Sequence, residues 1–164
     1  MKTLLVLRHA KSSWDDETLD DHERPLNKRG RRDGPRMGQL VREHALTPDL
    51  IISSDAVRAR LTAEAVAEAA GYAGDICFER DLYAAGPADI LAVLRTVTRT
   101  TAGTVMIVGH NSGLEELVAQ LTGEQPDLPT AALAQIVLPI ERWRDLKEST
   151  RGRLLGLWRP KEIA

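Results

Sequence analysis

Short apolar runs and amphipathic stretches alternate along this chain. Three continuous apolar runs, at residues 4–7, 50–53 and 104–108, are typical of strands that are buried on both faces of a sheet. Further apolar runs predict three more strands, at residues 76–78, 132–138 and 153–158. The last two are expected to close the sheet.

Helical patterns fall between these strands, at residues 28–44, from Asp55 to about Ala70, at 88–99 and at 113–121. We expect Asp55 to cap the second of these helices and Gly71 to end it. Strands that alternate with helices predict an α/β fold, a three-layer α/β/α sandwich around a mostly parallel sheet. We expect one domain over residues 1–164, with no cap domain.

Two polar segments do not fit this alternation. Residues 10–27 are rich in Asp, Ser and Glu and predict a long loop, which in a compact domain is usually functional or disordered. Residues 159–164 are expected to fray and are given no role.

Composition narrows the function classes. The chain has 164 residues and a formal net charge of -2, which provides no positive field for nucleic acid or an anionic membrane. Cys77 is the single cysteine, so an internal disulfide is excluded, and we expect a small buried strand residue there. The sequence holds no stretch long enough for a membrane span or a signal peptide. We therefore expect a soluble, cytoplasmic protein.

Candidate chemistry lies where three predicted strands end. Arg8 and His9 follow the first strand, Arg58 lies one turn into the helix after the second, and His110 follows the run at 104–108. Ligands of parallel sheets bind at the carboxyl ends of the strands, so we expect these four side chains to converge. A strand-end histidine by itself is more often structural. The joint occurrence of the three strand ends is what supports a site.

Two arginines and two imidazoles suit a dianionic phosphoryl group. The arginine fork matches phosphate oxygens, and a neutral histidine is a nucleophile if an acceptor, such as a backbone carbonyl, holds its other ring nitrogen. We expect Arg8, Arg58 and a protonated His110 to supply the positive charge that phosphoryl transfer requires. His22 and His44 are expected to be ordinary surface histidines. No histidine spacing indicates a metal site.

These residues lie in blocks that resemble a known family. The block Leu7-Arg8-His9-Ala10 resembles the Arg-His-Gly motif of the histidine phosphatase superfamily, and residues 53–63 and 108–111 resemble its second and third blocks. The element at 24–26, followed by 28–30, agrees with short phosphohistidine phosphatases of the SixA type. The resemblance covers nearly the whole chain. It implies a phosphoglycerate mutase-like fold and a phosphatase that needs no metal or cofactor.

The resemblance also implies roles. His9 would carry the phosphoryl group transiently, Arg8 and Arg58 would hold its oxygens, and His110 would complete the pocket. Arg24, from the long loop, would be an extra phosphate contact. Arg60 would point from a different helix face and be solvated or structural.

The sequence departs from the family in two places. Asp15 stands where many relatives have a small polar residue, and its carboxylate would repel phosphate unless it turns away or pairs with an arginine. Larger relatives place a Glu or Asp general acid in a loop or an extra subdomain. Here the stretch at 81–86 is short, and neither Glu79 nor Asp81, the only nearby carboxylates, is assigned as the acid.

A missing acid bears on the substrate. An alcohol leaving group gains about 10²–10⁴-fold from a general acid, whereas an imidazole departs without one. We therefore expect the substrate to be phosphohistidine in a protein. One alternative is a phosphatase of small phosphorylated metabolites. A second is a catalytically weak phosphate-binding or interaction module, for which a complete nucleophile set is not needed.

Overall fold

The computed structural model describes residues 1–97 and 101–163, and these form a six-stranded mixed sheet with four α-helices. The strands are β1 (Lys2–Arg8), β2 (Leu50–Ser54), β3 (Ile76–Glu79), β4 (Thr104–Gly109), β5 (Leu133–Leu138) and β6 (Arg153–Trp158). The helices are α1 (Lys28–Glu43), α2 (Val57–Ala70), α3 (Pro87–Val97) and α4 (Gly113–Thr122). Residues 98–99 of the expected helix at 88–99 lie outside the described residues.

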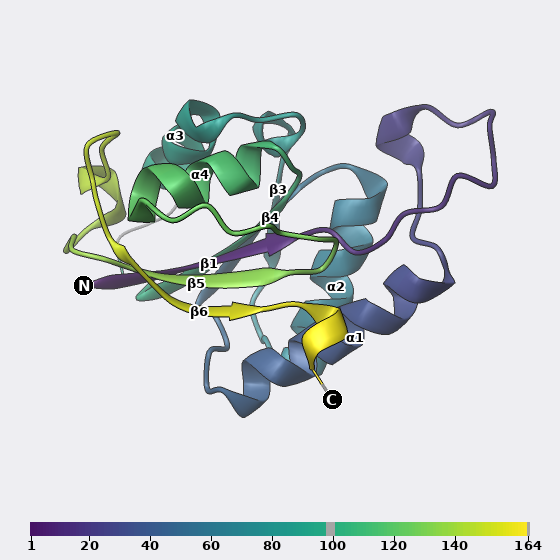
Figure 1. Cartoon of the computed structure of the whole chain (residues 1–164), viewed down its shortest axis with the longest axis horizontal. Coiled ribbons are helices and arrows are strands. Elements are labelled where there is room, and N and C mark those ends of the chain that lie inside the picture. Colours follow the sequence, from purple (N-terminus) through teal and green to yellow (C-terminus); the bar gives the residue numbers. More distant parts are fainter. Residues whose placement is uncertain (98–100, 164) are drawn as a thin grey trace.

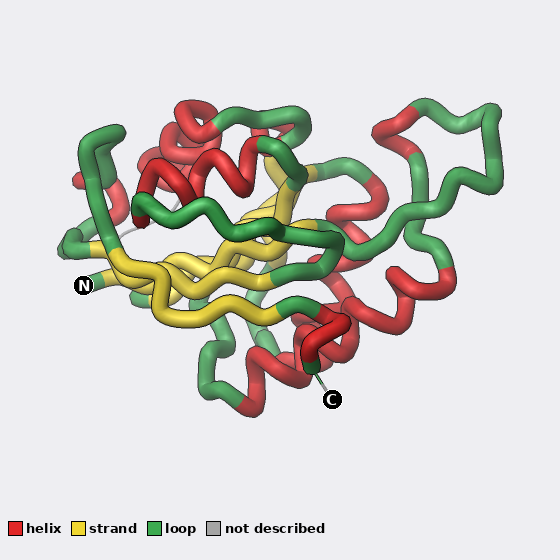
Figure 2. Tube along the Cα trace, viewed as in Figure 1, coloured by secondary structure: helices red, strands yellow, loops and turns green. Residues whose placement is uncertain are grey.

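The sheet order is β3-β2-β4-β1-β5-β6 (Figure 1; Figure 2). Neighbours among β3, β2, β4 and β1 are parallel, while β5 runs antiparallel to β1 and to β6. The prediction of a mostly parallel sheet is therefore confirmed. The carboxyl ends of β1, β2 and β4 lie at one edge, and β1 and β4 occupy the centre.

Helices cover both faces of the sheet, with α1 and α2 on one side and α3 and α4 on the other (Figure 1). The period of two in β1 divides its side chains between the two layers. Leu4 and Val6 belong to the core that includes α3 and α4, whereas Leu5 and Leu7 belong to the core of α1 and α2. The three-layer sandwich is confirmed, and no cap domain appears within residues 1–97 and 101–163.

Local details correct two expectations and confirm a third. Asp55 does not cap α2, because Ala56 takes the N-cap position and no side chain bonds there. Cys77 lies in β3 as expected but is only half-buried, because β3 is the outermost strand of its side. Gly71 does end α2, in the left-handed conformation with φ of 75°. None of the described helices is long and apolar enough to cross a membrane.

The two polar segments are more ordered than expected. In the long loop, Ser12 forms an isolated bridge with Leu26, and a short 3-10 helix, η1 (Asp21–Glu23), precedes Arg24. Near the C-terminus, Pro160–Glu162 form the 3-10 helix η4, and Arg36 of α1 donates to the Ile163 carbonyl at 3.0 Å. The expectation that this end frays is therefore wrong for residues 159–163.

Candidate active site

Strand register brings the two predicted histidines together. Arg8 of β1 pairs with Gly109 of β4, so His9 and His110 each follow directly on neighbouring parallel strands. The His9 amide donates to the Gly109 carbonyl at 3.0 Å. The two ring centroids lie 5.1 Å apart, with planes inclined by 52°.

His9 is buried and its ring is oriented by the backbone. The Nδ1 atom lies 2.7 Å from the Ala10 carbonyl oxygen, to which it donates as a neutral ring, and this leaves the lone pair on Nε2. Burial lowers the pKa of His9 to about 3, and the positive charges of Arg58 and Arg8 act in the same direction. His9 is therefore neutral near pH 7, with its nucleophilic nitrogen unprotonated.

One hydroxyl links the His9 loop to helix α2. The Ala10 amide donates to Thr62 Oγ1 at 2.9 Å, and that hydroxyl donates to the Arg58 carbonyl at 2.7 Å. On the opposite side, the Ala131 amide donates to the His9 carbonyl at 3.0 Å. These bonds fix the loop that carries His9 relative to the first turn of α2, where Arg58 lies.

His110 is buried beside the end of β2. Its Nε2 atom lies 2.8 Å from Ser54 Oγ, while Nδ1 is buried and has no hydrogen-bond partner among the described residues. Burial, followed by the charge of Arg58, lowers the pKa of His110 to about 4. His110 is therefore neutral near pH 7 in this structure, and its protonation during phosphoryl transfer stays a prediction. A phosphoryl dianion would favour the protonated ring.

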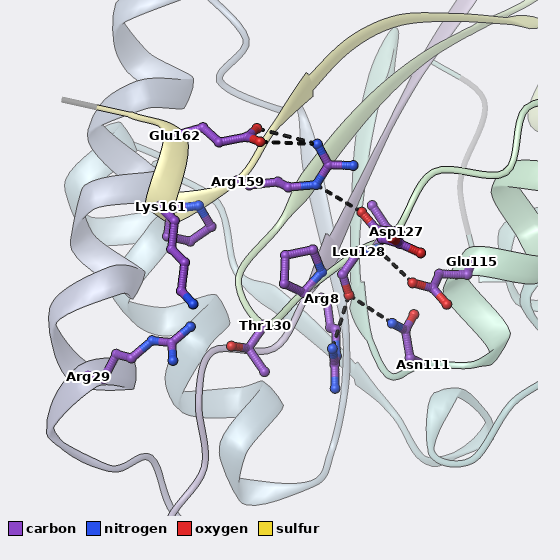
Figure 3. A pocket seen from close by; sticks show the side chains of 12 residues that line it. Arg8, Arg29, Asn111, Glu115, Asp127, Leu128, Thr130, Arg159, Lys161 and Glu162 are labelled. Atoms are coloured by element: carbon purple, nitrogen blue, oxygen red, sulfur yellow. Dashed lines mark hydrogen bonds and ion pairs between the residues drawn. The ribbon is translucent and has the colours of Figure 1, made fainter.

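Arg8 is half-buried and lines a neighbouring cavity (Figure 3). Its Nη1 donates to the Leu128 carbonyl at 3.0 Å, and Asn111 Nδ2 donates to the same oxygen at 2.8 Å. Glu115 of α4 faces the guanidinium and raises its pKa, against the larger lowering effect of burial. The Leu128 carbonyl and the Glu115 carboxylate together hold Arg8 in place at the cavity wall.

Asp21, a residue that the sequence analysis did not single out, joins the cationic side of the site. Its carboxylate accepts from Arg24 Nη1 at 2.7 Å, from Arg58 Nη2 at 2.9 Å and from the Tyr83 hydroxyl at 2.6 Å. Arg58 Nη1 also donates to the Asp21 backbone carbonyl at 2.6 Å. The Tyr83 hydroxyl, followed by Arg58, holds the pKa of Asp21 far below its usual range. Asp21 is therefore ionised and cannot serve as a general acid.

Among the described residues, Arg24 is linked to the site through the Asp21 carboxylate. Its other bonds stay within the long loop, with Nε donating to the Ser13 carbonyl at 3.1 Å and Nη2 donating to Ser12 Oγ. Its guanidinium carbon lies 3.3 Å from the centroid of the exposed Trp14 ring. A direct phosphate contact by Arg24 stays a prediction.

A row of rings continues from the histidine pair. Tyr83 meets His110 edge-on at 5.5 Å and His22 edge-on at 4.9 Å. His22 is not an ordinary surface residue, because its side chain is only 18% exposed and its Nε2 lies 2.8 Å from Asp55 Oδ1. The expectation for His22 is wrong, whereas His44 is exposed as expected.

Sequence signals for the missed residues were weak. Asp21 is one of six acidic residues in the loop, and only its position three residues before Arg24 distinguishes it. Tyr83 lies in the short stretch at 81–86, where a general acid would be a carboxylate, and no spacing pattern marks its phenol. Ser54 and Thr62 lie in the block at residues 53–63 that resembles the family's second motif, but no role was predicted for either.

The remaining candidates make no hydrogen bond or ion pair with His9 or His110 within the described residues. Asp15, Asp81 and Arg60 are exposed, and Glu79 accepts from Cys77 Sγ at 3.7 Å. The described residues contain no group of three or more His, Cys, Asp or Glu side chains that could hold a metal ion.

Known proteins are similar to this chain in sequence and in fold. The family described as histidine phosphatase superfamily (branch 1) matches residues 4–82. An uncharacterized protein of Mycobacterium tuberculosis is 30% identical over 94% of this chain and 100% of its own length. An uncharacterized chloroplastic protein of Arabidopsis thaliana is 35% identical over 82% of this chain, which spans 66% of that relative.

A solved structure that carries the name phosphohistidine phosphatase SixA, from Nakamurella multipartitia, is also similar. It has a TM-score of 0.85 and 26% identity, and covers 97% of this chain and 96% of that chain. The chain therefore belongs to the histidine phosphatase superfamily. Within that superfamily it is SixA-like, and the expected phosphoglycerate mutase-like fold is confirmed. The likeness supports phosphatase activity.

Proposed function

We propose that this protein hydrolyses phosphohistidine in other proteins, through a covalent phosphohistidine intermediate on His9 and without a metal or cofactor. The observation that carries the proposal is the orientation of His9. Its Nδ1 is bonded to the Ala10 carbonyl and its ring is neutral, with the charges of Arg8 and Arg58 close enough to lower its pKa. This arrangement supports a nucleophile next to bound oxyanions.

The chemistry proceeds in two displacements at phosphorus. In the first, the Nε2 lone pair of His9 forms a nitrogen–phosphorus bond while the bond to the substrate imidazole breaks, and the departing imidazole keeps that electron pair and takes a proton from water. In the second, a water oxygen attacks the same phosphorus, Nε2 departs with its electron pair, and the water proton passes to solvent. The products are a free histidine side chain and inorganic phosphate.

Positive charge near the phosphoryl oxygens supports both displacements. Arg8 and Arg58 would hold these oxygens. A proton taken up by His110 on substrate binding would add a third positive charge. Arg24 is an additional contact in this proposal, positioned by Asp21. The proposal treats residues 1–164 as one histidine phosphatase domain in the cytoplasm.

The absence of an assigned acid favours an activated phosphoryl donor. Asp21 is the carboxylate that bonds to Arg24 and Arg58, and it is ionised. Imidazole is a leaving group that departs without general acid catalysis, whereas a sugar or alkyl alcohol is not. The phosphohistidine substrate follows from that difference.

One observation favours a second candidate, a phosphatase of small phosphorylated metabolites. A cavity of about 520 Å³ lies beside Arg8, which is within the size range of small-molecule sites. A metabolite could place its phosphoryl group at His9 and its remainder in this cavity.

A substrate panel tests the proposal. Wild-type protein in the presence of a metal chelator should hydrolyse a phosphohistidine peptide with a kcat/KM about 10²-fold or more above that for an alkyl phosphate of similar size. His9→Ala should remove both activities, and p-nitrophenyl phosphate gives an independent assay of the same loss. Equal rates on the two substrate types would favour the metabolite phosphatase. No hydrolysis of any substrate would favour a binding module.

A further inference from the structure

The cavity beside Arg8 is built by segments that the proposed chemistry does not use. Its walls come from α1, from the loop before β5, from the start of α4 and from the η4 turn (Figure 3). The lining residues are Arg8, Arg29, Asn111, Glu115, Asp127, Leu128, Pro129, Thr130, Arg159, Pro160, Lys161 and Glu162. Arg8 lines this cavity and its charge also acts on His9, so the cavity adjoins the proposed phosphoryl pocket.

One part of the cavity has its charges paired. Arg159 Nη1 lies 3.3 Å from Glu162 Oε1, and Glu115 Oε2 accepts from the Leu128 amide at 2.6 Å. Asp127 adds an exposed carboxylate on the same side as Glu115 (Figure 3). This part therefore carries carboxylates that offset its arginine and is a poor place for an anion.

The opposite part carries excess positive charge. Arg29 extends into it from α1, and Lys161 extends into it from η4. Both lie across the cavity from Thr130 and Arg8 (Figure 3). Lys161 has no ion pair among the described residues. Arg29 Nε lies 3.7 Å from Asp33 Oδ2, a long contact. The two side chains therefore leave donors for a ligand.

The carboxylate near Arg29 is shared. Asp33 is buried, with its side chain 1% exposed, and it faces Arg32 and Arg36 at 3.5 Å as well as Arg29. A single negative charge cannot neutralise three guanidinium groups. Its presence accounts for the position of Arg29 without cancelling the positive charge at the cavity wall.

The η4 turn is a fixed platform for Lys161. Pro160 is buried, and Arg36 donates to the Ile163 carbonyl at 3.0 Å, which ties the turn to α1. Lys161 and Arg29 are thus presented by elements that are bonded to each other. A pair of cations held in this way is suited to one anionic group.

We propose that Arg29 and Lys161 form a second anion subsite, which binds an acidic group carried by the same molecule that places its phosphoryl group at His9. This inference rests on the proposed function. The shared chemistry is a carboxylate or a second phosphate, with Thr130 available as a neutral hydroxyl donor. In a phosphohistidine protein, the acidic group is a Glu or Asp side chain close to the phosphohistidine. In a metabolite, it is a second phosphate or a carboxylate.

The first experiment compares two phosphohistidine peptides that differ only by Glu or Gln near the phosphohistidine. Wild-type protein should prefer the Glu peptide by about tenfold in kcat/KM, because a partly exposed charge-assisted contact contributes about that factor. The double variant Arg29→Gln/Lys161→Gln should bring the ratio of the two kcat/KM values close to one. A wild-type ratio of one, or a variant that keeps the preference, contradicts an acidic side chain as the ligand.

A matched double variant controls for overall charge. Lys28→Gln/Lys147→Gln also removes two positive charges, from exposed side chains outside this cavity. It should keep the wild-type ratio. If it lowers the ratio as much as Arg29→Gln/Lys161→Gln does, long-range attraction explains the preference and the subsite is wrong. Thermal unfolding of both double variants verifies that they fold.

A binding experiment separates this inference from the proposed function. Calorimetry with non-hydrolysable alkyl diphosphonates of three to six carbons, compared with the alkyl monophosphonates of the same lengths, needs no turnover. The second phosphonate should strengthen binding by about tenfold at one chain length in the wild type but not in Arg29→Gln/Lys161→Gln. This result, obtained with a protein that hydrolyses nothing, would support the subsite and reject the phosphatase proposal. A gain with diphosphonates and none with the Glu peptide would identify a metabolite, and no gain with either would overturn the subsite.

Discussion

The two sides of the candidate pocket are held together in different ways. On the strand side, His9 and His110 follow β1 and β4, whose register is set by backbone hydrogen bonds. On the loop side, Asp21 and Arg24 come from residues 10–27 and reach the site through side-chain bonds, and the Asp21 side chain is 49% exposed. The strand side is thus determined by the fold, whereas the loop side depends on individual ion pairs.

Arg58 joins the two sides, so its loss should have the largest effect. Arg58→Ala removes a proposed phosphoryl ligand and also the partner of Asp21. We expect kcat/KM to fall by about 10²–10³-fold, the cost of removing a donor that stabilises charge in a transition state. Steady-state kinetics with p-nitrophenyl phosphate and a phosphohistidine peptide measure the loss.

Arg60 provides the matched control for Arg58, because it lies two residues further along α2 and is exposed. Arg60→Ala should stay within about twofold of the wild type, since surface substitutions usually have small effects. Equal losses for the two variants would show that α2 contributes only general charge.

The two strand-end histidines should make the fold sensitive to acid. Burial lowers the pKa of His110 to about 4 and that of His9 to about 3, from 6.5 in the unfolded chain. Between pH 6.5 and about 4 the unfolded state therefore binds more protons, and the free energy of unfolding falls as pH falls. From pH 7 to pH 5 we expect a loss on the order of 2 kcal/mol for each ring.

Urea unfolding at pH 7, 6 and 5 measures this dependence. His110→Gln should flatten it, whereas His44→Gln, at an exposed position, should not. The carboxylate of Asp21 acts in a separate range. Its lowered pKa adds stability that is lost only below its ordinary pKa of 3.8. A change in the pH dependence of the free energy of unfolding above pH 5 is therefore assigned to the strand-end histidines and not to Asp21. An unchanged slope in His110→Gln would contradict a neutral, buried ring.

A smaller effect is expected on the loop side. Asp21→Asn keeps the shape of the side chain but removes the charge that accepts from Arg24, Arg58 and Tyr83. We expect kcat/KM to fall by about tenfold, because half-exposed pairs contribute less than buried ones. The neighbouring Asp20→Asn, whose side chain is exposed, is the control. A rise in activity would mean that Asp21 competes with the substrate for the arginines.

The smallest effect is expected at the rim of the loop. His22→Asn removes the 2.8 Å contact with Asp55 and the edge contact with Tyr83, which anchor the loop to the start of α2. We expect a loss of about threefold in kcat/KM, in line with a partly exposed pair. A loss as large as that of Asp21→Asn would place His22 closer to the reaction than an anchor.

The same division separates what the sequence predicted from what it did not. The apolar runs before Arg8–His9 and His110 predicted the strands, and parallel strands predicted that their ends meet. The loop side had no such rule, because the position of Asp21 depends on η1, on Arg24 and on a tyrosine 62 residues away. Sequence patterns report periodicity, and side-chain bonds between loops have none.

Two further features have the same physical origin. The charge that a phosphoryl group needs favours a protonated His110, whereas burial lowers the pKa of the ring to about 4. The end of the chain was expected to fray because it is polar, yet Pro160 is buried and the turn is bonded to α1. Both outcomes depend on desolvation and packing, which a one-dimensional pattern does not contain.

The carboxylate of Asp21 lies among the cations that the proposed function assigns to oxyanion binding. It takes up part of their charge, so a free orthophosphate ion meets a partly neutralised pocket. Under the proposed function, we therefore expect inorganic phosphate to leave the pocket readily and to inhibit hydrolysis only weakly.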